Sequence, residues 1–222
     1  IIHSIMLLAK NKSSDTLPYK IFGIEYAQFA RFEANIVQTN KVSAHSELVT
    51  HFNAGIIIPY GNSSVAPYFQ QFYSGGPNSL RGFRLRAIGP GSYSTEESFS
   101  GNNFYFDQSG DIKIEANIEY RFDIYKWFKW AFFADAGNVW LLKKDVDRPG
   151  GEFTSKFYED IALSFGAGLR LDFTYFVIRT DLAMPIIDPR YDDNWRLNKI
   201  DFTDSNWRSR NLIFSLAIGY PF

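Results

Sequence analysis

The 222-residue sequence contains no cysteine, which excludes disulfide bonds and cysteine-based metal sites within it. It has no apolar run of about 18 residues, so no membrane-spanning helix is expected. The formal net charge is −1 at pH 7, and this balance gives no reason to expect a nucleic acid partner. The three histidines, His3, His45 and His51, are scattered, and no serine nucleophile motif is present. We therefore expect no enzymatic activity, no metal and no cofactor.

Aromatic residues are abundant, at 18% of the chain with 22 Phe, 13 Tyr and 5 Trp. This content is heavy for a soluble domain and is typical of a barrel with aromatic belts at the membrane surfaces. The first residues, IIHSIMLLAKNKSSD, lack the basic start of a secretion signal, and the first methionine is Met6. We expect an internal or C-terminal piece of a longer protein, or a processed product.

Long segments alternate between apolar and polar residues. In DIKIEANIEYRF, residues 111–122, Ile, Ala, Tyr and Phe occupy every second position, and charged or amide residues occupy the others. This is the periodicity of a β-strand. We predict about eight antiparallel strands, at residues 2–9, 20–38, 46–60, 110–123, 129–141, 160–172, 174–187 and 211–222.

The length of these segments helps to decide between a transmembrane β-barrel and a soluble β-sandwich. Strands of about 10 residues or more exceed the usual length in soluble sheets and match the roughly 9–11 residues that a tilted strand needs to cross a bilayer. A soluble sandwich also alternates, with its apolar face inward, and is the alternative. The polar faces mix charges of both signs, which favours a transmembrane antiparallel β-barrel with apolar side chains outward and polar side chains inward.

The connections between the predicted strands alternate in length, as they do in outer-membrane barrels. This alternation predicts that the C-terminus lies on the periplasmic side and that the long loop lies outside. Trp127 and Trp130 fall near one predicted membrane interface, and Trp140, Trp195 and Trp207 near the other; buried or loop positions are the alternative. The short connections are residues 39–45, 124–128 and 173, and the long ones are 61–109, 142–159 and 188–210.

The stretch QQFYSGGPNSLRGFRLRAIGPGS, residues 70–92, follows neither a helical nor a strand period. Its five glycines and two prolines predict a loop. Yet Arg81 stands among apolar residues such as Leu80, Phe83 and Ile88. A solvated loop does not need this composition, so we predict a loop that folds back into a polar cavity.

Four motifs, in order along the chain, resemble those of the BamA/TamA outer-membrane insertase superfamily (surface antigen type). GGPNSLRGFRLRAIGPG resembles its loop motif, with the core triplet at Arg81, Gly82 and Phe83. FFADAGNVW, residues 132–140, is similar to its aromatic strand that carries an aspartate before a glycine. SFGAGLRLDFTYFVIRTDLAMPI resembles its penultimate hairpin, and FSLAIGYPF resembles its C-terminal β-signal. The chain looks closest to the TamA-like TamL branch of Bacteroidetes.

The resemblance implies that residues 1–222 are the C-terminal part of an outer-membrane β-barrel of roughly sixteen strands. It also implies that the loop at 61–109 enters the lumen, where Arg81 meets acidic residues. The expected partners of Arg81 are Glu119 and Asp135, because strand parity places both side chains inward. They would bind the guanidinium through charge-assisted hydrogen bonds. The alternative is that Arg81 is one of several lumen charges in a diffuse network. The implied β-signal residues are Phe214, Leu216, Ile218, Gly219, Tyr220 and Phe222.

The implied function is the insertion or translocation of other β-barrel proteins through a lateral seam of a bacterial outer-membrane barrel. Expected partners are unfolded outer-membrane β-barrel clients, the lipid bilayer and other assembly-machinery subunits. The alternative is a two-partner-secretion type or passive outer-membrane pore, because such relatives share the loop arginine and the aspartate. Gly219 and Pro221 either weaken the last strand so that the seam opens, or only mark its end.

Overall fold

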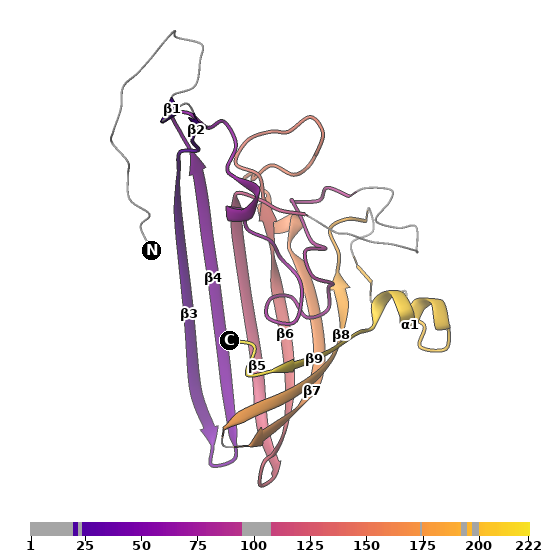
Figure 1. The fold of residues 1–222 in the computed structure, drawn as a ribbon. Coiled ribbons are helices and arrows are strands. Elements are labelled where there is room, and N and C mark those ends of the chain that lie inside the picture. The colour runs from indigo at the N-terminus through magenta and orange to yellow at the C-terminus, as the bar shows by residue number, and fades with distance from the viewer. Residues whose placement is uncertain (1–19, 22–23, 95–107, 174, 192–194, 197–199) are drawn as a thin grey trace.

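The computed structural model describes residues 20–21, 24–94, 108–173, 175–191, 195–196 and 200–222 (Figure 1). Two short strands, β1 (Lys20–Ile21) and β2 (Ile24–Glu25), pair as a small separate sheet. The predicted strand at residues 2–9 lies outside the described residues. Within the described residues, no helix is long and apolar enough to cross a membrane.

The main sheet has seven antiparallel strands, which lie side by side in chain order. The prediction of an all-β antiparallel fold is confirmed. Figure 1 shows that the sheet is strongly curved and that part of the described connection after β4 lies inside the curve. The strands are β3 (Phe29–Ser43), β4 (Ser46–Pro59), β5 (Ile112–Tyr125), β6 (Phe128–Trp140), β7 (Ala162–Phe173), β8 (Phe176–Ile187) and β9 (Ile213–Ile218).

The two faces of the sheet differ as the alternation predicts. Large apolar side chains on the convex face are exposed, which is the arrangement expected where lipid covers a barrel. On the concave face, polar and charged side chains are buried. The convex set includes Phe32, Ile36, Phe52, Ile118, Phe132, Phe165, Leu182, Phe214, Leu216 and Ile218. The concave set includes His51, Asn53, Glu115, Asn117, Glu119, Arg121, Asp135, Ser164, Arg170, Arg179 and Asp181.

The first long strand is shifted from its predicted position. Residues 20–38 do not form one strand, because β3 begins at Phe29 and continues to Ser43. The predicted connection 39–45 is mostly strand, since Ser43 pairs with Ser46 and only two residues separate β3 from β4. The hydroxyls of Ser43 and Ser46 lie 2.8 Å apart at this turn.

The last strand is shorter than predicted. Residues 211–222 do not form one strand, because Asn211 ends the helix α1 (Ser205–Asn211) and β9 ends at Ile218. Gly219 has a φ of +93°, which favours glycine and turns the chain out of the sheet. Pro221 follows and has no N–H to continue the ladder.

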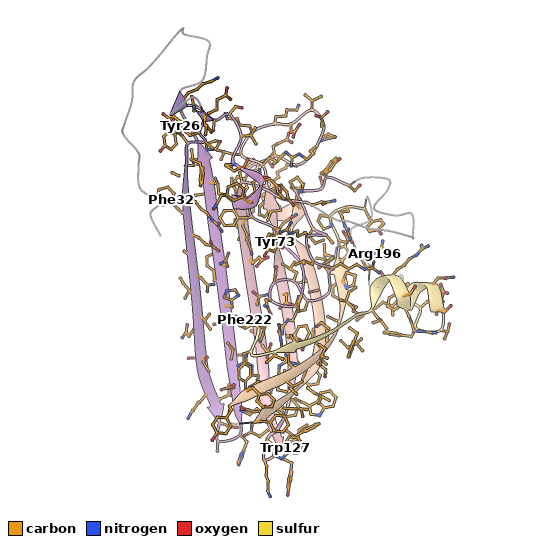
Figure 2. The ribbon with its side chains drawn as sticks, viewed as in Figure 1. Tyr26, Phe32, Tyr73, Trp127, Arg196 and Phe222 are labelled. Atoms are coloured by element: carbon orange, nitrogen blue, oxygen red, sulfur yellow. The ribbon has the colours of Figure 1, made fainter. Side chains whose placement is uncertain are left out.

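Short and long connections lie at opposite ends of the sheet, as predicted. The β3–β4, β5–β6 and β7–β8 turns share the end where Figure 2 shows Trp127. The long connections leave the sheet at the other end, and their described residues include the short helices η1 (Tyr68–Gln70) and η3 (Phe157–Asp160). For Trp140, the buried alternative holds and not the interfacial girdle: this side chain is fully buried, and Phe153 and Phe157 from the β6–β7 connection contact its ring edge-on.

Candidate functional site: the motif loop on the concave face

The glycine-rich loop packs onto the concave face through its apolar residues. Leu80, Phe83 and Ile88 form a buried cluster with Ala162, the first residue of β7. A second cluster joins loop residues Ala66 and Phe72 to Ile57 on β4 and Val139 on β6. These contacts explain the apolar content of the loop, because its side chains fill the space enclosed by the curved sheet.

Arg81 binds two carboxylates of the sheet. Its Nε and Nη2 donate to the two oxygens of Asp135, at 2.9 and 2.7 Å, and its Nη1 donates to Glu119. The backbone N–H of Arg81 also donates to Asp135, at 3.0 Å. All three side chains are fully buried. Such bidentate, charge-assisted bonds fix both the position and the orientation of the guanidinium.

A third contact holds the Arg81 guanidinium from the side. Its Cζ lies 3.5 Å from the centre of the Phe133 ring, which is a close cation–π contact in a site shielded from water. Burial alone would lower the pKa of Arg81, but the carboxylates of Asp135 and Glu119 raise it above its ordinary value. The guanidinium therefore stays charged while it is buried.

The next two residues of the motif bring the loop backbone against the sheet. The N–H of Gly82 donates to the hydroxyl of Ser164, at 3.2 Å. A side chain at position 82 would collide with Ser164 and with the backbone of Met184, so only glycine allows this approach. Phe83 is buried in the apolar cluster, and its carbonyl accepts a bond from the N–H of Gly76 at 3.0 Å.

The Arg81 contacts belong to a larger network. Glu119 also accepts bonds from Arg121, at 2.7 Å, and from Arg170, at 3.2 Å. Arg170 pairs in turn with Asp181 on β8. The specific clamp and the diffuse network, which the sequence leaves as alternatives, are therefore both present in the geometry. The alternation in the sequence predicts that Arg170 and Asp181 point inward, but it does not predict which groups they pair with.

The predicted β-signal residues divide between the two faces. Phe214, Leu216 and Ile218 are exposed on the convex face, as the alternation predicts. The same alternation places Tyr220 and Phe222 outward, and this is wrong, because the chain turns inward at Gly219. The hydroxyl of Tyr220 donates to Asp172 at 3.0 Å, and the Phe222 ring stacks on His51 of β4. Figure 2 labels Phe222 inside the curve of the sheet.

Comparison with known families agrees with this geometry. A model of the Omp85 superfamily domain matches residues 19–222. The chain belongs to the Omp85 superfamily. The resemblance to the BamA-like insertase superfamily is thereby confirmed, whereas the TamL branch stays a prediction.

Two curated relatives of this Omp85 chain illustrate its similarities. The sorting and assembly machinery component 50 homolog A of Xenopus laevis is 30% identical over 151 residues, which are 64% of this chain and 30% of the relative. The outer membrane protein assembly factor BamA of Neorickettsia risticii is 30% identical over 117 residues, 52% of this chain and 14% of the relative. The Omp85 chain thus spans less than a third of the length of these relatives.

A solved structure shares the fold. The crystal structure of BamA from Haemophilus ducreyi lacking POTRA domains 1–3 has a TM-score of 0.59 and 20% sequence identity to the Omp85 chain. The similarity covers 86% of this chain and 35% of that one. At this level of identity, the match shows a common fold.

Proposed function

We propose that residues 1–222 are the C-terminal part of an outer-membrane β-barrel that helps to insert or translocate other β-barrel proteins. The observation that best supports this proposal is the Arg81 clamp, which seats the superfamily's motif loop inside a curved sheet with an apolar convex face. In this proposal the chain lies in the bacterial outer membrane, and the remainder of a roughly sixteen-stranded barrel comes from the longer parent. The loop at 61–109 enters the lumen.

The proposed role follows from the cost of unpaired backbone in lipid. An unfolded strand cannot remain in a bilayer with free N–H and C=O groups, so it needs a partner edge. Within the described residues, β9 is an edge strand that pairs only with β8. Parting β9 from the first strand of the full barrel offers this edge to a client strand, which adds by β-augmentation.

The short turns set the proposed orientation, with the hairpin end of the sheet and the C-terminal segment on the periplasmic side. Proposed partners are unfolded outer-membrane β-barrel clients, the surrounding lipid and other assembly-machinery subunits. No enzymatic step, cofactor or nucleic acid is part of the proposal. The relatives named above are assembly components by their names, which supports assembly over a two-partner-secretion type or passive pore.

The test uses the full-length parent in liposomes. Folding of a urea-unfolded β-barrel client is followed by its gel shift, with wild type, Arg81→Ala and the control Arg148→Ala, whose guanidinium pairs with Asp145 in the β6–β7 connection. Acceleration by wild type and the control, weakened by Arg81→Ala, supports the proposal. No acceleration by wild type, together with ion conductance that rises in Arg81→Ala, indicates a gated pore instead.

The seam is tested separately with a reversible lock. Ile218→Cys is combined with a cysteine at the facing position of the first strand of the parent barrel. The oxidised protein is expected to lose client folding, and reduction is expected to restore it. Full activity of the oxidised protein contradicts a mechanism that opens this seam.

A further inference from the structure

The motif loop has a second attachment to the sheet, at Glu115 on β5. One oxygen of this carboxylate accepts bonds from the hydroxyls of Ser74, at 2.7 Å, and of Ser79. The other oxygen lies 3.0 Å from Nζ of Lys113. Glu115 is buried, so a buried anion holds the turn that precedes Arg81.

The turn between Ser74 and Ser79 is shaped to meet this carboxylate. Gly75 and Gly76 have φ values of +98° and +97°, a region that favours glycine. The N–H of Gly75 donates to Ser79 Oγ at 3.0 Å, while the same hydroxyl donates to Glu115. Ser79 therefore joins the turn's own backbone to the sheet.

Gly137 on β6 makes room for the Glu115 side chain. The two residues are register partners on neighbouring strands. A Cβ at position 137 would lie 2.7 Å from Cγ of Glu115 and would also collide with the carbonyl of Ile114. The glycine of the FFADAGNVW motif thus has a packing role that is separate from that of Asp135.

Asn117 connects the two attachments. It lies on β5 between Glu115 and Glu119, and all three side chains face the loop. Its Nδ2 donates to the carbonyl of Ser79, at 2.8 Å, and to Asp135, at 3.0 Å. The concave row of β5 therefore contacts the loop both before and at the Arg-Gly-Phe triplet.

We infer that Glu115 is a positioning residue that seats the motif loop through Ser74 and Ser79, as an attachment additional to the Arg81 clamp. Its importance for activity rests on the proposed function, but its effect on the loop does not. Removing the carboxylate leaves two buried hydroxyls without their acceptor, and bonds to a charged group are among the stronger hydrogen bonds in proteins. The turn should then open while the barrel stays folded.

The experiment measures loop opening directly in the full-length parent in liposomes. The chain has no cysteine, so Ala87→Cys places one thiol at a buried loop position, with any cysteine elsewhere in the parent replaced by serine. The rate of maleimide labelling is compared with and without Glu115→Ala, and the heat-dependent gel shift reports the folded barrel. We expect labelling to accelerate by about tenfold or more from the lost charged hydrogen bonds.

Two further variants keep the test decisive. Glu115→Gln retains an acceptor oxygen and should accelerate labelling less than Glu115→Ala. Asp123→Ala is the matched control, because this carboxylate lies further along β5 on the same face and pairs with His45 and Lys129 rather than with the loop. If Glu115→Ala does not fold, the paired change Ser74→Ala with Ser79→Ala removes the same two bonds from the loop side.

The outcomes separate this inference from the proposed function. Labelling that is unchanged by Glu115→Ala, or that rises equally in Asp123→Ala, overturns the positioning role. Faster labelling only in the Glu115 or serine variants supports that role, whatever the parent does to clients. Failure of the wild-type parent to accelerate client folding overturns the proposed function instead.

Discussion

The Phe222 ring stacks on the His51 imidazole, with ring centres 4.8 Å apart and 15° between their planes. His51 lies on β4, and Phe222 follows β9, which is the far edge of the sheet. The imidazole is held in place by Asn117, at 2.7 Å, and Asn35, at 3.2 Å. The Arg81 guanidinium lies 5.5 Å from the Phe222 ring. The end of the chain thus contacts both the sheet wall and the seated loop.

Phe222→Ala is expected to destabilise the folded barrel by roughly 1–3 kcal/mol, since it removes the ring stack and its buried area. The measurement is the urea midpoint of the gel-shift transition in the full-length parent. Phe214→Ala is the matched control, because that ring is exposed on the convex face and contacts lipid in the proposed orientation. Equal losses in the two variants contradict a specific role for the His51 contact.

Arg81→Lys is expected to cost about 3 kcal/mol or more, although it keeps the charge. An ammonium cannot donate bidentately to Asp135 while it also reaches Glu119 and stacks on Phe133. Urea unfolding measures the loss, with Arg148→Lys as the control at an ion pair outside the loop. Wild-type stability in Arg81→Lys would mean that charge alone, and not the geometry of the guanidinium, holds the loop.

Gly82→Ala is expected to displace the loop, because the new Cβ collides with Ser164 and with the backbone of Met184. Ser164→Ala removes only the hydrogen bond to the Gly82 N–H and should cost about 1 kcal/mol. Maleimide labelling of Ala87→Cys should therefore rise much more in Gly82→Ala than in Ser164→Ala. The reverse order indicates that the hydroxyl, and not the close approach, fixes the backbone.

The β6–β7 connection is expected to become more stable as the pH falls. Burial raises the pKa of Asp160 above its usual value of 3.8, and the nearby Glu159 and Glu152 add to this effect. The folded state therefore binds the proton more tightly than the unfolded chain, so stability increases as the pH falls through the raised pKa. Hydrogen exchange of residues 141–161, compared between pH 7 and a pH close to the usual Asp value of 3.8, tests this sign.

Two asparagine variants distinguish the contribution of Asp160 to the pH dependence from that of other titrating groups. Asp160→Asn should remove the pH response, because the amide does not titrate. Asp145→Asn in the same connection is the control: a hydrogen bond from Arg148 lowers the pKa of Asp145, so its carboxylate favours the folded state at higher pH. A pH response that survives Asp160→Asn assigns the effect to another group.

Much of the site could be predicted because it follows from strand parity. The alternation in residues 111–122 places Glu119 inward, and the aspartate of FFADAGNVW falls on the inward parity of its own strand. The resemblance of the Arg-Gly-Phe triplet to the loop motif of the superfamily implies that Arg81 is the loop residue that meets them. The partners of Glu115 could not be predicted, because Ser74 and Ser79 lie in a segment without a period and meet β5 only after the glycine turn has formed.

The sequence by itself determined most of the strands, the two faces of the sheet and the position of the glycine-rich motif loop, because period-two alternation and glycine-rich turns are properties of neighbouring residues. Only the tertiary structure decided which distant groups meet. Gly82 and Ser164 are 82 positions apart, and the buried Trp140 ring contacts Phe153 and Phe157 from the β6–β7 connection. The inward turn at Gly219 is likewise visible only in the tertiary structure. A single positive φ ends the alternation, and the curvature of the sheet then places Phe222 against His51.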